Sequence, residues 1–206
     1  GLQGMVEVTG LCCTAIDVTR YSPKAKIVGP ISWQLRYIRS GIPDVVVVDE
    51  QCIRADSLIE AQKIKAPLIA SSPKNCLGLP NRTNDPADEI VADLVSGKAP
   101  GALILDPEKV GEVAVKTAML VAPKRKKFKT IPSTKELIEG ANKCKRCNQC
   151  RRACPNDLHI PEAIEEAAKG KLDKLADLYD ECIGCARCES ACPQNLPIHS
   201  FIVKAA

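Results

Sequence analysis

The sequence predicts a mixed α/β protein with two structural regions, one built around a parallel sheet and one built only from helices. Short apolar runs alternate with amphipathic stretches up to about residue 122, which is the pattern of parallel βα units. After a basic segment, the chain changes to helical patterns that surround two cysteine-rich repeats. We therefore expect an α/β region at 1–122, a basic linker at 123–132 and a helical region at 133–206.

Five short apolar segments are predicted to form the strands of the first region. They span residues 5–8, 26–28, 44–49, 67–70 and 101–105. The third contains four consecutive valines, a composition typical of a strand buried on both faces in the middle of a parallel sheet.

Amphipathic stretches that follow these strands predict the helices that would cover the sheet. They span residues 13–21, 33–40, 55–64, 86–96 and 107–121. The alternation predicts a doubly wound, Rossmann-like layer with about five strands. No G-x-G-x-x-G or G-x4-G-K-[ST] loop follows a strand, so the sequence does not support nucleotide binding.

The second region begins with a capping-box pattern from Ser133 to Glu136, which predicts a helix that ends at Gly140. Two more helices are predicted at 161–170 and 172–179, between the cysteine repeats.

Eight of the twelve cysteines lie in two copies of the pattern C-x2-C-x2-C-x3-C-P, which begin 38 positions apart, at 144 and 182. This is the spacing of bacterial 4Fe–4S sites, in which three cysteines wrap one cluster and the fourth ligates the other. Two copies favour iron–sulfur clusters over a zinc site or a disulfide framework. The crossed assignment gives Cys144, Cys147, Cys150 and Cys192 to one 4Fe–4S cluster, and Cys182, Cys185, Cys188 and Cys154 to the second.

This pattern predicts an α-helical ferredoxin-like module with two clusters, and its helical spacer resembles the ferredoxin modules of respiratory iron–sulfur subunits. Its cysteines are ligands, and no residue is assigned a catalytic role. His159 and His199 each follow a repeat, where we expect a surface or hydrogen-bonding role rather than metal ligation.

The charge and cysteine usage limit the partners and the compartment. The formal charge is +4, but each assembled cluster with its four thiolates adds about −2, so the loaded chain is close to neutral. We therefore expect no nucleic-acid partner. No apolar run approaches the ~20 residues of a membrane span, and clustered reduced thiolates indicate a cytoplasmic protein. The basic run at 123–129 is interpreted as a solvated linker, with a docking site for an acidic partner as the alternative.

Four cysteines lie in the α/β region. Cys12, Cys13 and Cys52 follow predicted strands, at the edge where open α/β sheets place their sites. A shared metal site and ordinary buried thiols are both open interpretations of their position.

The segments Gly10-Leu-Cys-Cys-Thr14 and Val46-Val-Val-Asp-Glu-Gln-Cys-Ile53 resemble anaerobic nickel–iron carbon monoxide dehydrogenases. With both cysteine repeats downstream, the chain is similar to α subunits of archaeal acetyl-CoA decarbonylase/synthase complexes. The resemblance implies that Cys13 and Cys52 ligate a nickel–iron–sulfur C-cluster, with Cys12 as a neighbour, and it assigns no role to Cys76. It also implies the other subunits of the complex and a ferredoxin or similar electron acceptor as partners, in an oligomeric parent protein.

The family's reaction is the reversible conversion of CO and water to CO2, two protons and two electrons. The family site also needs a histidine and further cysteines that this sequence lacks, so the resemblance implies an internal segment. We expect that segment to relay electrons through two 4Fe–4S clusters and to be inactive toward CO by itself. The alternative is a stand-alone ferredoxin-type electron-transfer module attached to an unrelated α/β domain.

Overall fold

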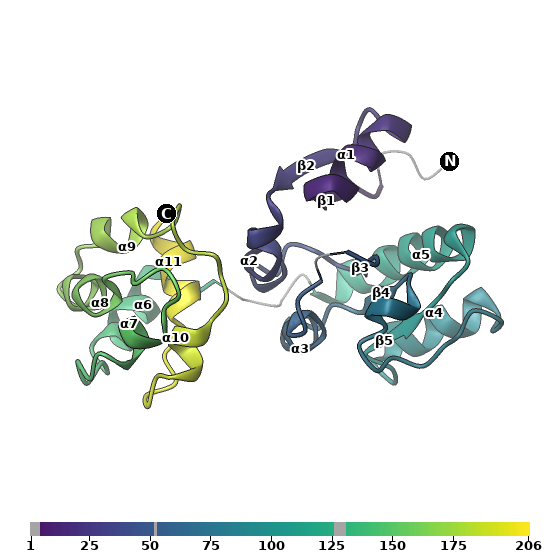
Figure 1. Cartoon of the computed structure of the whole chain (residues 1–206). Coiled ribbons are helices and arrows are strands. Elements are labelled where there is room, and N and C mark those ends of the chain that lie inside the picture. Colours follow the sequence, from purple (N-terminus) through teal and green to yellow (C-terminus); the bar gives the residue numbers. More distant parts are fainter. Residues whose placement is uncertain (1–4, 52, 126–130) are drawn as a thin grey trace. The chain divides into compact units, whose positions relative to one another are not determined.

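Two compact units, Gly1–Phe128 and Lys129–Ala206, make up the chain in a computed structural model that describes residues 5–51, 53–125 and 131–206 (Figure 1). The boundary falls within 123–132, the segment that the sequence assigns to a linker. The first unit is α/β, and the regular elements in the described part of the second are all helices.

In the described part of the first unit, the strands form two separate parallel sheets. One pairs β1 (Thr9–Leu11) with β2 (Lys26–Gly29), and the other has the order β3 (Val46–Val48), β4 (Leu68–Ala70), β5 (Gly101–Leu103). The prediction of one five-stranded, Rossmann-like layer is therefore wrong. Each strand has three or four residues. An apolar run in the sequence indicates that a strand is buried, but it does not indicate which other strand pairs with it.

The first strand begins four residues later than the segment 5–8 suggested. It includes Gly10, a residue that strand propensity disfavours. A Cβ atom at this position would lie 2.8 Å from the Cα of Ala15 in the following helix, α1 (Cys12–Tyr21). Gly10 therefore lets the helix approach the strand closely.

The valine-rich strand β3 lies at an edge of its sheet, which corrects its predicted place in the middle. Val47 is 48% exposed, whereas Val48 is buried. The central strand is β4, whose residues Leu68, Ile69 and Ala70 are fully buried. Four apolar residues in a row were not enough to distinguish an edge strand from a central one.

Helices cover both faces of the three-stranded sheet, as the doubly wound pattern predicts. On one face, α2 (Gln34–Arg39) and α3 (Ser57–Lys63) pack on Leu68 and Ala70. On the other face, α4 (Ala87–Ser96) and α5 (Pro107–Arg125) pack on Ile69. Short 3-10 turns η1 (Ile31–Trp33) and η2 (Pro73–Asn75) precede α2 and follow β4.

The last helix of the first unit continues into the expected linker. Arg125, its final residue, is buried, and its guanidinium donates hydrogen bonds to the carbonyl oxygens of Gly41, Pro43 and Ile64. It also pairs with Asp44 at 2.9 Å. Arg125 is therefore part of the packed first unit, whereas we expected it in a solvated linker. Residues 126–130 of that linker lie outside the described residues.

Over its described residues, 131–206, the second unit has six short helices around an apolar core. They are α6 (Thr134–Ala141), α7 (Gln149–Ala153), α8 (Ile160–Ala168), α9 (Asp173–Asp177), α10 (Arg187–Ser190) and α11 (Ile198–Ala205). The predicted capping box is present, because Ser133 and Glu136 exchange side-chain and backbone hydrogen bonds. Helix α6 meets α11 where Gly140 faces Phe201, and a Cβ at Gly140 would lie 2.5 Å from the Phe201 ring. Across the described residues, no helix is long and apolar enough to cross a membrane.

Candidate metal centres

The 38-residue repeat is present in the backbone as well as in the cysteine spacing. Three pairs of repeat-related residues have a positive φ angle: Arg146 and Gly184, Asn148 and Ala186, Asp157 and Asn195. Left-handed backbone costs an L-residue roughly 1–2 kcal/mol, so surrounding contacts must hold these loops in place. Both copies therefore follow the same path between their cysteines.

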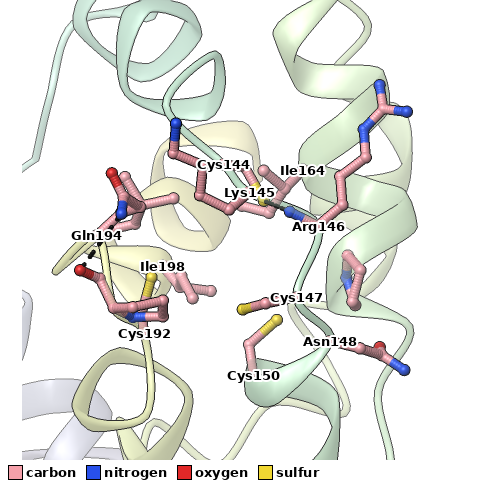
Figure 2. Close-up of a pocket in the computed structure, with 13 residues that line it drawn as sticks. Cys144, Lys145, Arg146, Cys147, Asn148, Cys150, Ile164, Cys192, Gln194 and Ile198 are labelled. Atoms are coloured by element: carbon pink, nitrogen blue, oxygen red, sulfur yellow. Dashed lines mark hydrogen bonds between the residues drawn. The ribbon is translucent and has the colours of Figure 1, made fainter.

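One cavity of the second unit combines cysteines of both repeats. Cys144, Cys147 and Cys150 come from the first repeat and Cys192 from the second, and together they line a cavity of about 370 Å³ that includes space open to solvent. Figure 2 shows the sulfur atoms of Cys147 and Cys150 directed into this space, with Cys192 facing them from the other side. We name it the first cavity.

A second cavity has the reciprocal composition. Cys182, Cys185 and Cys188 of the second repeat line it together with Cys154 of the first, around about 350 Å³ that also opens to solvent. The two cavities thus divide the eight cysteines into the same two sets of four as the crossed ligand assignment. That they bind clusters stays a prediction.

The fourth cysteine of each repeat lies in the cavity formed by the other repeat, and this follows from how each repeat ends. Cys154 comes directly after α7 and Cys192 shortly after α10, and each precedes a proline. The residue before a proline is disfavoured in helical conformation, and Cys154 has an extended backbone with φ −75° and ψ 122°. The chain therefore leaves α7 at this cysteine and places it in the other cavity.

Burial alters the acidity of two of these thiols. Burial raises the pKa of the Cys150 thiol to about 11, with the neighbouring Cys144 and Cys147 adding to the effect. Burial also raises the pKa of Cys188, and the carboxylate of Glu189 raises it further. Without a metal, both groups hold their protons at neutral pH, so metal binding must release them.

The donor set of each cavity fits a 4Fe–4S cluster, because four cysteine thiolates are the ligands that such a cluster takes. The backbone N–H of Arg146 also points at the Cys144 sulfur, 3.4 Å away, and hydrogen bonds to the sulfurs tune cluster potentials. None of the described cysteines forms a disulfide. In the described ranges, no three His, Cys, Asp or Glu side chains converge closely enough for a single metal ion.

Cys13 lies at the exposed start of α1, against the segment that follows β3. Its thiol lies 3.9 Å from Oε1 of Gln51, and the neighbouring Thr14 hydroxyl donates a hydrogen bond to Asp49. The two strands that precede these segments belong to different sheets, so pairing of adjacent strands is not what brings them together. Cys52, the other predicted C-cluster ligand, lies outside the described residues.

The remaining two cysteines of this unit differ in their surroundings. Cys12 begins α1 with a φ of 58°, in the left-handed region. Cys76 follows η2 and packs, half-buried, against the apolar core beneath β3 and β4.

The two histidines occupy different environments, which their similar positions after the repeats did not reveal. His159 is on the surface, 3.6 Å from Glu162 and within reach of Arg151. His199 is buried in α11 and lines the second cavity. The apolar residues on either side of His199, Ile198 and Phe201–Ile202, are the sequence signal that could have indicated its burial.

Comparison with known proteins gives two findings. A protein-family model described as "4Fe-4S dicluster domain" matches residues 143–196, so the chain carries such a domain.

The second finding concerns relatives that match most of the chain. The chain is 56% identical over 177 residues to the acetyl-CoA decarbonylase/synthase complex subunit alpha of Methanothermobacter thermautotrophicus. It is 50% identical over 187 residues to subunit alpha 1 of Methanosarcina mazei, and 49% identical over 180 residues to that of Methanopyrus kandleri.

These matches cover 86–87% of the chain but only 23–24% of each relative. The chain therefore spans about a quarter of the length of the curated relatives that it matches. The first match is more than twice as long as the helical unit, so it includes much of the α/β unit as well.

Proposed function

We propose that the helical unit binds two 4Fe–4S clusters and relays electrons through them. The first would be held by Cys144, Cys147, Cys150 and Cys192, and the second by Cys182, Cys185, Cys188 and Cys154. The observation that carries the proposal is the presence of two four-cysteine cavities inside the matched dicluster domain. When bound, such a cluster accepts and donates single electrons.

The residues of the unit hold and insulate these positions. The repeat loops fix three cysteines of each set, and the fourth ties the first repeat to the second. Helix α11 contributes to both cavities, with Ile198 in the first and Ile202 in the second. These buried side chains exclude water from one side of each cavity, and they lie about one turn apart on the same helix.

We further propose that the parent protein is the α subunit of an acetyl-CoA decarbonylase/synthase complex that acts as a carbon monoxide dehydrogenase. Support comes from the identity of about half of the residues to proteins of that name. In this proposal Cys13 and Cys52 ligate the nickel–iron–sulfur C-cluster, and the other subunits and a ferredoxin-type acceptor are the partners. The reaction is the reversible oxidation of CO to CO2 in the cytoplasm.

The length of the match argues against an unrelated α/β domain joined to a ferredoxin-type module. Such a fusion would be similar to these relatives in the helical unit alone, whereas the match extends well beyond it.

Metal analysis of the anaerobically assembled chain tests the cluster proposal. We expect about eight irons and about eight sulfides per chain, with an absorbance band near 400 nm. About four irons, or zinc in place of iron, would contradict it.

Nickel analysis of the full-length parent tests the second proposal. Replacing Cys13 or Cys52 by alanine should abolish bound nickel and CO oxidation while the eight irons of the helical unit remain. Cys76→Ala is the matched control and should keep both. CO-dependent dye reduction by the 206-residue chain itself would contradict the expectation that its C-cluster ligands are incomplete.

A further inference from the structure

The two cavities have the same cysteine donors but different charged surroundings. Lys145 and Arg146 line the first cavity, and Figure 2 shows both side chains extending outward from the loop at its edge. Among the described residues that line the second cavity there is no lysine, arginine or carboxylate, and apart from its cysteines it is lined by His199, Asn156 and apolar side chains.

The cavities also differ in exposure. Of the eight repeat cysteines, Cys147 is exposed and Cys188 is buried, while the other six are half-buried. The repeat-related partner of Cys147 is the half-buried Cys185, and that of Cys188 is the half-buried Cys150. Both cavities open to solvent, but the first alone has an exposed cysteine, Cys147, among the four that line it.

The repeat provides an internal control for the basic charges. We define the basic rim as Lys143, Lys145 and Arg146, which are all exposed. The positions 38 residues later are occupied by Glu181, Ile183 and Gly184. Since the second cavity collects its four cysteines without any of these cations, the rim is not required for cysteine geometry.

The three rim cations differ in their ion pairs. Arg146 forms an ion pair with Glu165 at 3.2 Å. Lys143 and Lys145 have no ion pair with any carboxylate in the described part of the chain. Their charge is therefore available to a molecule that approaches the exposed Cys147.

We propose that the basic rim is the docking surface for an acidic one-electron carrier protein that exchanges electrons at the first cavity. The proposal rests on the proposed cluster binding and adds which of the two sites faces the partner. Each encounter transfers one electron, so the donor is oxidised by one unit and the acceptor is reduced by one. Complementary charge accelerates such encounters, and salt weakens the effect.

An acidic protein fits this surface better than a nucleic acid does. Proteins that bind single strands combine basic grooves with aromatic side chains that stack on bases. Aromatic residues make up 3% of the sequence, and none lies between Lys143 and Cys154 or lines the first cavity.

Charge reversal on the full, cluster-loaded chain tests the proposal, with an acidic [2Fe–2S] ferredoxin as the probe. Stopped-flow electron transfer from the reduced chain to this probe is measured at several ionic strengths. Lys145→Glu should lower the second-order rate constant at low salt by roughly tenfold and flatten its salt dependence. Lys174→Glu makes the same charge change at an exposed lysine outside both cavity linings, and it should leave the rate unchanged.

Iron content, measured on the same samples, separates the two proposals. Wild-type chain without iron would refute cluster binding itself. Eight irons with equal rates for Lys145→Glu and Lys174→Glu would overturn the docking surface and leave cluster binding intact. Lys143 lies outside the cavity lining, so Lys143→Glu serves as a second variant if Lys145→Glu loses iron. The proposal then requires that Lys143→Glu keeps its iron and shows the same loss of rate. The docking surface would also be overturned if the chain bound duplex DNA more tightly than it binds the ferredoxin at equal concentration, and if salt weakened that DNA binding.

Discussion

The first and second cavities share a backbone plan but not an environment. Both are built from the same loop and short helix, with left-handed residues at matching positions 38 residues apart. The first is edged by cations and contains the exposed Cys147, whereas the second has no cation or carboxylate in its lining and contains the buried Cys188. Backbone geometry thus sets which cysteines line each cavity, while individual side chains set charge and solvent access, which are factors that tune the potential of a bound cluster.

The largest expected effect comes from weakening the apolar core against which α11, the helix that lines both cavities, packs. Phe201 in α11 is 2% exposed, and truncating such a side chain to alanine typically costs 3–5 kcal/mol. Because α11 lines both cavities, Phe201→Ala should lower the denaturant midpoint and release both clusters in one transition. Circular dichroism and cluster absorbance followed together would check this. Loss of one cluster alone would mean that the cavities do not depend on a common core.

A smaller effect is expected at the contact between α6 and α11. Gly140→Ala would place a methyl group 2.5 Å from the Phe201 ring, and overpacking of this kind costs about 1–3 kcal/mol. The matched control is Gly111→Ala in α5, where a Cβ meets nothing within 4 Å and helix propensity predicts a gain of about 0.5–1 kcal/mol. Denaturant unfolding of both variants would measure the two values. Equal effects of the two substitutions would show that the α6–α11 contact is loose.

The sequence predicted the helical unit better than the sheet region, and the reason is physical. Cluster ligation imposes a spacing on neighbouring residues, so the pattern can be read locally. The order of strands is decided by long-range packing, and nothing in the valines of β3 distinguishes an edge from a centre. Arg125 is a similar case, because one of its acceptors, the Gly41 carbonyl, lies 84 positions away in the sequence.

The sequence predicted more of the candidate site in the helical unit than in the α/β unit. The two sets of four cysteines followed from motif spacing alone, whereas the burial of His199 and the contrast in charge between the cavities needed the structure. Cys13 and Cys52 were expected to follow strands of one sheet, whereas the contact of Cys13 with Gln51 joins segments that follow strands of two different sheets.

The smallest expected effect concerns the cation at the first cavity. Lys145→Ala removes a positive charge beside one proposed cluster, which disfavours its more negative reduced form. An exposed charge contributes about 0.2–1 kcal/mol, equivalent to about 10–40 mV for one electron. We expect one of the two potentials to fall by that amount in an anaerobic redox titration followed by electron paramagnetic resonance. Two unchanged potentials would show that the rim does not tune the first site.

Crossed ligation is the central claim, and iron analysis of two double variants tests it most directly. Cys154→Ala with Cys185→Ala removes two ligands of the same proposed cluster, so the chain should retain about four irons. Cys147→Ala with Cys154→Ala removes one ligand from each cluster, and the iron content should fall toward zero. If each repeat instead held its own cluster, the two results would be reversed. About four irons in the Cys147/Cys154 variant and almost none in the Cys154/Cys185 variant would contradict the account.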